Sequence, residues 1–378
     1  MPKNYFKAIA VLIGYIIGVG MFGVPFLVSK SGMYVFLVLI VSLGLMQHFF
    51  HLIYANVILV TKDYHRLPGY AGVYLGKNGK RVATFSKLVG NYGALLAYII
   101  ITGIFLNDLF SPYFGGNEFI YASLMFTLMA IVLFFGIKMF ARVELVMTTI
   151  LLLVVGLIII KGGSEIAPTN YTVINWKYFL LPYGAILFAV DGNGAIPIVV
   201  KLMRRNQRQV RNIISIGTLT AITVIIAFTI VVVGISGAAT TPDALTGISN
   251  SLGRGMLVFA LLFGVLTMIT SFLGVAESVR EMLWWDYKFN KRVAWACAVF
   301  VPYLLYLIGF KNLIDVISFA GAVAGGLSAI ILILIFRKLE KMSDKLILFK
   351  RKPGRAYTSV LIFIFICGIV YELFNFFA

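Results

Sequence analysis

The chain has 378 residues, of which 61% are hydrophobic and 12% charged, and its formal net charge is +18. Apolar stretches of about 18 residues or more recur along the whole sequence, which excludes a soluble globular protein and predicts an all-α integral membrane protein. The linkers between these stretches are short, so a single membrane domain is expected to fill residues 1–378.

The apolar stretches predict eleven transmembrane spans, and the basic residues alternate from one linker to the next. The spans are 6–29, 34–60, 84–110, 118–138, 141–161, 179–203, 210–236, 252–280, 292–310, 313–337 and 356–376. All but five of the 32 Lys and Arg residues fall on the side of the N-terminus. By the positive-inside rule, the N-terminus is expected in the cytoplasm and the C-terminus outside. A basic protein that binds nucleic acid would not show this alternation.

The first span contains the run GYIIGVGMFGVP at 14–25. In hydrocarbon, an unpaired backbone N–H or C=O costs several kcal/mol, so a broken helix persists only where protein, water or ligand satisfies the freed groups. The N–H groups that begin the second half-helix would suit a carboxylate, and glycine lets a ligand approach the backbone closely. The candidate substrate-binding residues in this run are Gly18, Gly20, Met21, Phe22 and Gly23.

In the second span, His48 and His51 share a helical face, and no further ligand at useful spacing supports a metal site. A hydrogen-bonding pair that faces the helix bundle is the favoured interpretation. The following segment, 62–81, is expected to be a cytoplasmic loop with an amphipathic stretch. It lacks the strand and the GK[ST] ending of a P-loop, so no chemical energy source is indicated.

The sixth span contains a second interruption, the run FAVDGNGAIP at 188–197. A pair of Gly/Pro-interrupted helices in two halves of a chain indicates the central site of a secondary transporter. Two facing breaks offer N–H groups to a carboxylate and carbonyls to an ammonium group, the two charges of an α-amino acid. Asp191 would accept that ammonium group, titrate with a coupling proton, or cap the break. The candidate substrate-binding residues here are Phe188, Ala189, Asp191 and Gly194.

The eighth span carries a stripe of hydroxyl side chains at helical spacing, Thr267, Thr270 and Ser271. Such oxygens can complete the shell of a hard monovalent cation, although Ser and Thr also bond back to carbonyls of their own helix. Both interpretations remain open. The two cysteines, Cys297 and Cys367, form no disulfide or metal pattern. No cofactor is expected, and the coupling ion is Na⁺ or H⁺.

The runs at 14–25 and 188–197, with YGALLAY at 92–98 and ITSFLGV at 269–275, resemble the amino acid/auxin permeases of the amino acid/polyamine/organocation superfamily. They are similar to the bacterial aromatic and hydroxy amino-acid permeases in particular. The resemblance implies a LeuT-type fold of two inverted five-helix repeats, 6–161 and 179–337, with a peripheral helix at 356–376. Spans 1 and 6 would be broken, and spans 1, 2, 6 and 7 would move against a scaffold of spans 3, 4, 8 and 9.

The same resemblance assigns functions to individual residues. It adds Tyr98 to the substrate site, and it pairs Thr270 and Ser271 with the carbonyls of Gly14 and Ile17 in a sodium site. Proton-coupled relatives place a lysine in span five, where this sequence has Leu151. This departure weakens a lysine-based proton mechanism but leaves proton coupling open.

We therefore expect a secondary-active transporter of the plasma membrane that carries a neutral L-amino acid with a cation. Its expected partners are the amino acid and the lipid bilayer, with no nucleic acid and no obligatory protein partner. An amino-acid sensor and a permease for another solute remain alternatives, and the short ends of the chain speak against a sensor. An enzyme would need a nucleophile–base or metal set, and a metal permease would need a carboxylate at 18–25.

Overall fold

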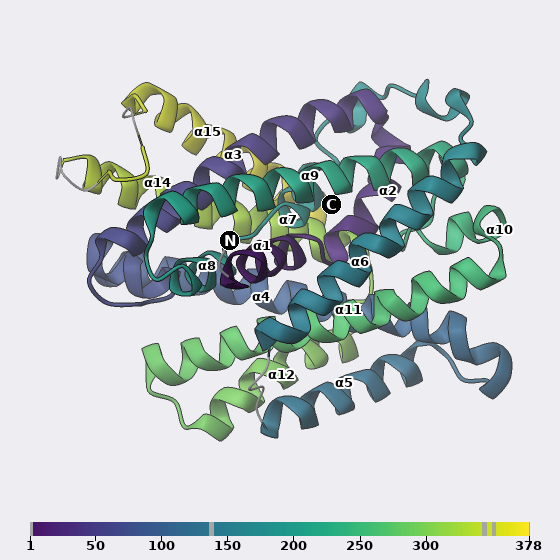
Figure 1. Ribbon diagram of the computed structural model, residues 1–378, viewed down its shortest axis with the longest axis horizontal. Coiled ribbons are helices and arrows are strands. Elements are labelled where there is room, and N and C mark those ends of the chain that lie inside the picture. Colours follow the sequence, from purple (N-terminus) through teal and green to yellow (C-terminus); the bar gives the residue numbers. More distant parts are fainter. Residues whose placement is uncertain (1–2, 136–139, 342–345, 350–352, 378) are drawn as a thin grey trace.

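The computed structural model describes residues 3–135, 140–341, 346–349 and 353–377, and within these ranges the protein is built from helices alone (Figure 1). The end of the fourth predicted span, 136–138, lies outside the described residues. Eight helical segments of the described chain are long and apolar enough to cross a membrane, and the bent pair α1–α2 makes a ninth. The eight segments correspond to α3 (Met33–Val60), α4 (Leu67–Phe114), α5 (Glu118–Phe135), α6 (Phe140–Gly162), α9 (Gln207–Ser236), α11 (Arg254–Glu281), the continuous unit α13 (Leu313–Phe319)–η7 (Ala320–Gly325)–α14 (Gly326–Glu340), and α15 (Arg355–Phe377).

The first predicted span is broken between α1 (Lys3–Ile16) and α2 (Val19–Ser31), which meet at an angle of 44°. Gly18 has non-helical dihedrals, φ −125° and ψ −149°, and its N–H donates to the carbonyl of Ile16 at 3.0 Å instead of continuing the helical ladder. The break thus lies at the start of the glycine-rich run. Gly20, Gly23 and Pro25 belong to α2, where they are helical.

The sixth predicted span consists of two seven-residue helices, α7 (Tyr183–Ala189) and α8 (Ile196–Leu202), joined by the segment 190–195. We call this segment the second break. Pro197 stands in the first turn of α8, where its missing N–H removes no helical hydrogen bond. The ninth predicted span is the 17-residue helix α12 (Lys291–Leu307). Because α7, α8 and α12 are short, their status as membrane spans stays a prediction.

The segment after α3 differs from the expected loop. Helix α4 starts at Leu67 and is 48 residues long, with one kink at Gly76, whose φ is 77°. Before the kink, Tyr70, Ala71 and Tyr74 are buried, and this packing turns the amphipathic stretch into a docked helix. The predicted third span, 84–110, is the later part of α4.

Short elements connect the long helices. The linker from α6 to α7 contains the 3₁₀ turns η1 (Gly163–Glu165), η2 (Pro168–Tyr171) and η3 (Trp176–Tyr178). The linker from α9 to α11 contains η4 (Gly237–Ala239), η5 (Thr246–Ile248) and α10 (Ser249–Leu252). The π-helical turn η6 (Met282–Asp286) extends α11.

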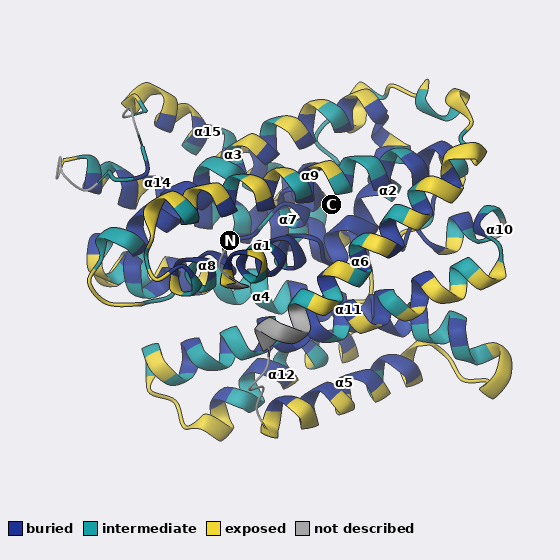
Figure 2. Ribbon diagram, in the orientation of Figure 1, coloured by how far each residue is buried: buried dark blue, intermediate teal, exposed yellow. Residues whose placement is uncertain are grey.

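The helices pack around α1 and α4. Helix α1 packs against α6, α8 and α9, and α3 packs against α8 and α9. Helix α4 packs against α5, α11 and α12, with α5 and α12 together at the lower edge of Figure 1, and α6 packs against both α1 and α11. Buried residues gather around α1, whereas exposed residues follow the outer faces of α5, α6 and α15 (Figure 2). An apolar outer surface is what a lipid-facing helix presents.

The linkers after α3, α8 and α11 meet at one end of the helices, here called the basic end. The guanidinium of Arg205, after α8, donates to the carbonyls of Ile58, Leu59 and Thr61 at the end of α3. Arg66, after α3, forms an ion pair with Glu281 of α11 at 3.1 Å. The bonds from Arg205 satisfy carbonyls that the end of α3 leaves without helical partners.

Candidate functional site

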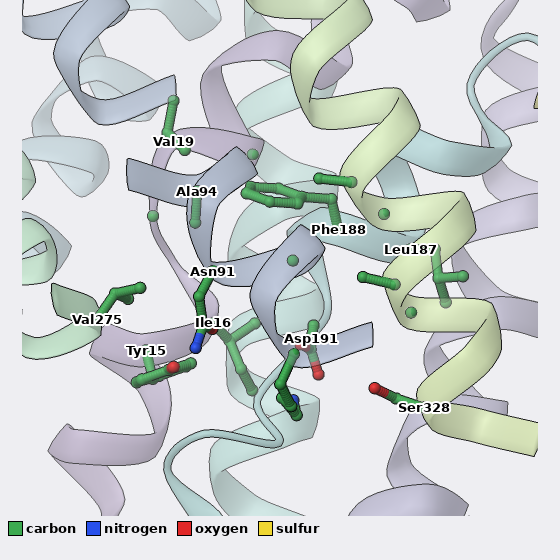
Figure 3. Close-up of a pocket in the computed structure, with 18 of the residues that line it drawn as sticks. Tyr15, Ile16, Val19, Asn91, Ala94, Leu187, Phe188, Asp191, Val275 and Ser328 are labelled. Atoms are coloured by element: carbon green, nitrogen blue, oxygen red, sulfur yellow. The ribbon is translucent and has the colours of Figure 1, made fainter. Parts of the chain in front are cut away.

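A cavity lies where the two breaks come together, bounded also by α4, α11 and the chain from η7 into α14 (Figure 3). In Figure 3, Tyr15, Asn91, Asp191 and Ser328 lie toward one end of this central cavity, and Val19, Ala94 and Phe188 toward the other. The central cavity is lined by Tyr15, Ile16, Gly18, Val19, Gly20, Ser86, Lys87, Gly90, Asn91, Ala94, Tyr98, Leu187, Phe188, Asp191, Val275, Ala320, Gly321, Ala324, Gly325 and Ser328. The labelled polar side chains therefore gather toward one end of the cavity, with Ile16 among them.

One face of α4 forms the wall opposite the breaks. Lys87, Asn91, Ala94 and Tyr98 follow one another at intervals of four, three and four residues. These intervals put all four side chains on one helical face. Sequence reasoning selected Tyr98 from this face and missed Lys87 and Asn91. The signal was present, because both lie within the predicted third span, where charged and amide side chains are costly.

Asp191 organises the second break through a single carboxylate oxygen. Its Oδ1 accepts from Asn193 N at 3.0 Å, from Asn193 Nδ2 at 2.6 Å and from Gln47 Nε2 at 2.9 Å. None of these bonds uses Oδ2, and Asp191 lines the central cavity. The side chain thus caps the break and leaves its second oxygen out of these three bonds.

His51 holds the next residue of the same break. It is fully buried, and its Nε2 accepts from the backbone N–H of Gly192 at 3.0 Å. Since a backbone N–H only donates, the imidazole proton is assigned to Nδ1, which then donates to Thr218 Oγ1 of α9 at 3.0 Å. His51 therefore joins α3, the second break and α9. The sequence indicated a hydrogen-bonding pair that faces the bundle, but not the partners of His51, and Nδ1 of His48 has no hydrogen-bond partner in the described chain.

Glycines allow the breaks to come this close. A Cβ on Gly20 would lie 2.7 Å from Ala189 Cα and 2.9 Å from Phe188 Cδ1. A Cβ on Gly192 would lie 2.9 Å from His51 Cε1, and one on Gly194 would overlap the phenol of Tyr15. Close approach of a ligand was the expected reason for Gly20, but close approach of the two helices is the reason that the structure gives.

The remaining candidates for substrate contact lie outside the lining of the central cavity. Met21 and Phe22 are buried, and Phe22 packs edge-on against Phe105 and Phe228. Gly23 faces Ile317 of α13, and Ala189 contacts Gly20. Gly194 lines a second cavity nearer the basic end. The structure thus brings Gly18, Gly20, Tyr98, Phe188 and Asp191 together, and places the other candidates around them.

None of the five cation candidates lines either described cavity. The Thr267 hydroxyl donates to the Phe263 carbonyl at 2.9 Å, and the Thr270 hydroxyl to the Thr267 carbonyl at 3.0 Å. Ser271 is different, because its Oγ is buried and has no hydrogen-bond partner in the described chain. Gly14 lies in α1, next to the break that contains Ile17. An orphan oxygen on the predicted stripe fits a hard cation ligand.

Comparison with known proteins decides the family. The model of the tryptophan/tyrosine permease family matches residues 1–375. The chain belongs to this family. Its resemblance to bacterial amino-acid permeases is thereby confirmed, and the protein is a transporter rather than an enzyme. As a member of this permease family it is a membrane protein with several spans.

Two relatives and one solved structure are similar to this chain over most of their length. Glutamine transporter 2 of Aliivibrio fischeri is 22% identical over 378 residues, covering 94% of this chain and 95% of its own. Tyrosine-specific transport system 1 of Haemophilus influenzae is 24% identical over 334 residues, covering 82% and 81%. The crystal structure of MhsT in complex with L-phenylalanine superposes with a TM-score of 0.71 at 14% identity, covering 100% of this permease and 99% of MhsT. The predicted LeuT-type fold class is confirmed by this likeness.

Proposed function

We propose that this permease is a secondary-active symporter that moves a neutral L-amino acid together with a cation by alternating access. The observation that carries the proposal is the meeting of two helix breaks at a cavity whose one carboxylate is Asp191. The names of the two relatives, a glutamine and a tyrosine transporter, support a neutral amino acid as the substrate.

The breaks supply groups for both charges of an amino acid. Oδ2 of Asp191 would accept the substrate ammonium group. The first N–H groups of α2, at Val19 and Gly20, have no acceptor within their own helix and lie at its positive end, so they would bind the carboxylate. The side chain would then extend toward Phe188 and Ala94 (Figure 3).

The coupling ion is Na⁺ or H⁺, and the orphan Oγ of Ser271 favours Na⁺. By the family resemblance, Leu151, which is buried in α6, stands near the position at which proton-coupled relatives have a lysine. We propose that the protein lies in the plasma membrane and that its basic end faces the cytoplasm. Arg205 ties α8 to the end of α3, which supports movement of the α8 half of span 6 together with span 2.

The proposal is tested by uptake into proteoliposomes that contain the purified protein. Labelled glutamine, tyrosine, phenylalanine and tryptophan are compared with glutamate and lysine, under an imposed Na⁺ gradient or an imposed pH gradient. We expect saturable, gradient-dependent uptake of neutral substrates alone. Binding of an amino acid to the purified protein without uptake under either gradient would replace the symporter by a sensor.

A further inference from the structure

Lys87 is the one cation among the residues that line the central cavity, and it lies within the membrane-spanning part of α4. No described carboxylate lies within ion-pairing distance of its Nζ, since the ion pairs of the described chain are Arg66–Glu281 and Arg280–Glu277. A lysine at membrane depth without a carboxylate partner is costly, and such residues commonly serve substrates or ions. The substrate contacts proposed at the breaks, with Asp191 and with the first N–H groups of α2, do not involve Lys87.

A second cavity lies beside the central one, nearer the basic end. The two cavities share Tyr15, Lys87 and Asn91. Arg66 also lines the second cavity, but its guanidinium is already bonded to Glu281 at 3.1 Å and to the Gly194 carbonyl at 3.3 Å. Lys87 is therefore the cation of this cavity that remains available to a ligand.

Asn193 supplies a complementary acceptor in the second cavity. The residue is 3% exposed and its Nδ2 donates to Asp191, while its Oδ1 is buried and has no hydrogen-bond partner in the described chain. A buried amide oxygen without a donor costs about 1–3 kcal/mol. The second cavity is thus lined by an unused cation and by a residue whose buried amide oxygen lacks a donor, the complements of a carboxylate and an ammonium group.

We propose that Lys87 and Asn193 form a second binding subsite for the amino-acid substrate, in which Lys87 Nζ binds its carboxylate and Asn193 Oδ1 its ammonium group. This inference rests on the proposed transport function and adds a station between the central cavity and the basic end. A substrate that leaves the breaks would exchange its contacts with α2 and Asp191 for contacts with Lys87 and Asn193. Both of its charges would then stay paired while it crosses the low-dielectric interior.

The test compares Lys87→Met and Lys87→Arg with wild-type protein in proteoliposomes whose protein orientation is determined by protease accessibility. The matched control is Lys77→Met, an exposed position in the same helix α4. We expect Lys87→Met to raise the half-saturating concentration of the amino acid at the basic end about tenfold or more, as for loss of a charged hydrogen bond. At the opposite face the value should stay within about threefold, and Lys87→Arg should retain the wild-type value at both faces.

A second measurement uses the decarboxylated amine of the transported amino acid as a competitor. Its inhibition constant at the basic end should be the same for wild type and Lys87→Met, because the amine has no carboxylate for Lys87 to bind. If Lys87→Met does not fold, Lys87→Gln takes its place, with the same expected pattern.

Two results would overturn the subsite in a wild-type protein that transports. One is a half-saturating concentration for Lys87→Met equal to that of Lys77→Met at both faces. The other is an equal change in the half-saturating concentration of the amino acid and in the inhibition constant of the amine. That result would mean that Lys87 acts through Asp191 or through the stability of the fold. A wild-type protein without saturable uptake would instead contradict the proposed function itself.

Discussion

Gly20 and Gly23 form a matched pair that tests whether close approach of the two breaks makes the site. Both are buried glycines of α2, so changing either to alanine gains a similar helix-propensity term of about 0.5–1 kcal/mol. At Gly20 the new methyl would lie 2.7 Å from the backbone of Ala189, and ordinary contact begins near 3.4 Å, so α7 must shift by about 0.7 Å. At Gly23 the obstacle is the terminal Cδ1 of Ile317, which can rotate away.

Forcing a methyl into a close-packed contact costs about 1–3 kcal/mol, which corresponds to about a 5- to 150-fold change in affinity. We expect Gly20→Ala to raise the half-saturating substrate concentration at least tenfold, because the displaced Ala189 is two residues from Asp191. Gly23→Ala should stay within about threefold of wild type. Uptake in proteoliposomes and thermal unfolding in detergent measure the two effects separately. Equal kinetics for the two variants would refute the assignment of Gly20 to the site.

Three further predictions concern the polar groups. Asp191→Asn keeps an oxygen to cap the break but removes the charge. The half-saturating substrate concentration should therefore rise about 10- to 100-fold, while the unfolding temperature stays unchanged. A lower unfolding temperature with normal uptake would mean that Asp191 is purely structural. His51→Phe leaves the Gly192 N–H unpaired, so its unfolding temperature should fall below that of the wild type. His51→Gln retains an acceptor, so its unfolding temperature should fall less. Equal losses for the two variants would contradict a stabilising hydrogen bond between Gly192 and His51. Na⁺ should strengthen substrate binding relative to choline at fixed pH, and Thr270→Val with Ser271→Ala should remove this effect; equal wild-type affinities in the two salts would leave the proton as the coupling ion.

The broken spans could be predicted because their signals are local. Glycine, proline and a carboxylate inside an apolar run conflict with a continuous membrane helix wherever they occur. The position of the first break at Gly18 was less accessible, since Gly20 and Gly23 give the same local signal although both are helical. Their role depends on α7 and α13, which are distant in the sequence.

The hydrogen bond that holds the second break to His51 could not be derived from sequence, because His51 and Gly192 are 141 residues apart. The docked first part of α4 was missed for the same reason: its Tyr and Ala side chains are buried by tertiary packing, which a local pattern does not reveal. Lys87 was assigned to the cytoplasmic charge bias, and only the two cavities distinguish it from the other lysines. The division into two inverted repeats and the roles of the individual site residues stay predictions.

The bonds from Arg205 to the end of α3 have a mechanical consequence when they are combined with the packing of α7. Arg205 fastens the far end of α8 to α3, whereas glycines at 184 and 321 let the backbone of α7 lie directly on α13 and η7. With both half-helices clamped to different neighbours, rotation between them must concentrate in the six residues 190–195. That segment would act as a hinge between α7 and α8, and a ligand bound to Asp191 would restrict the rotation of this hinge.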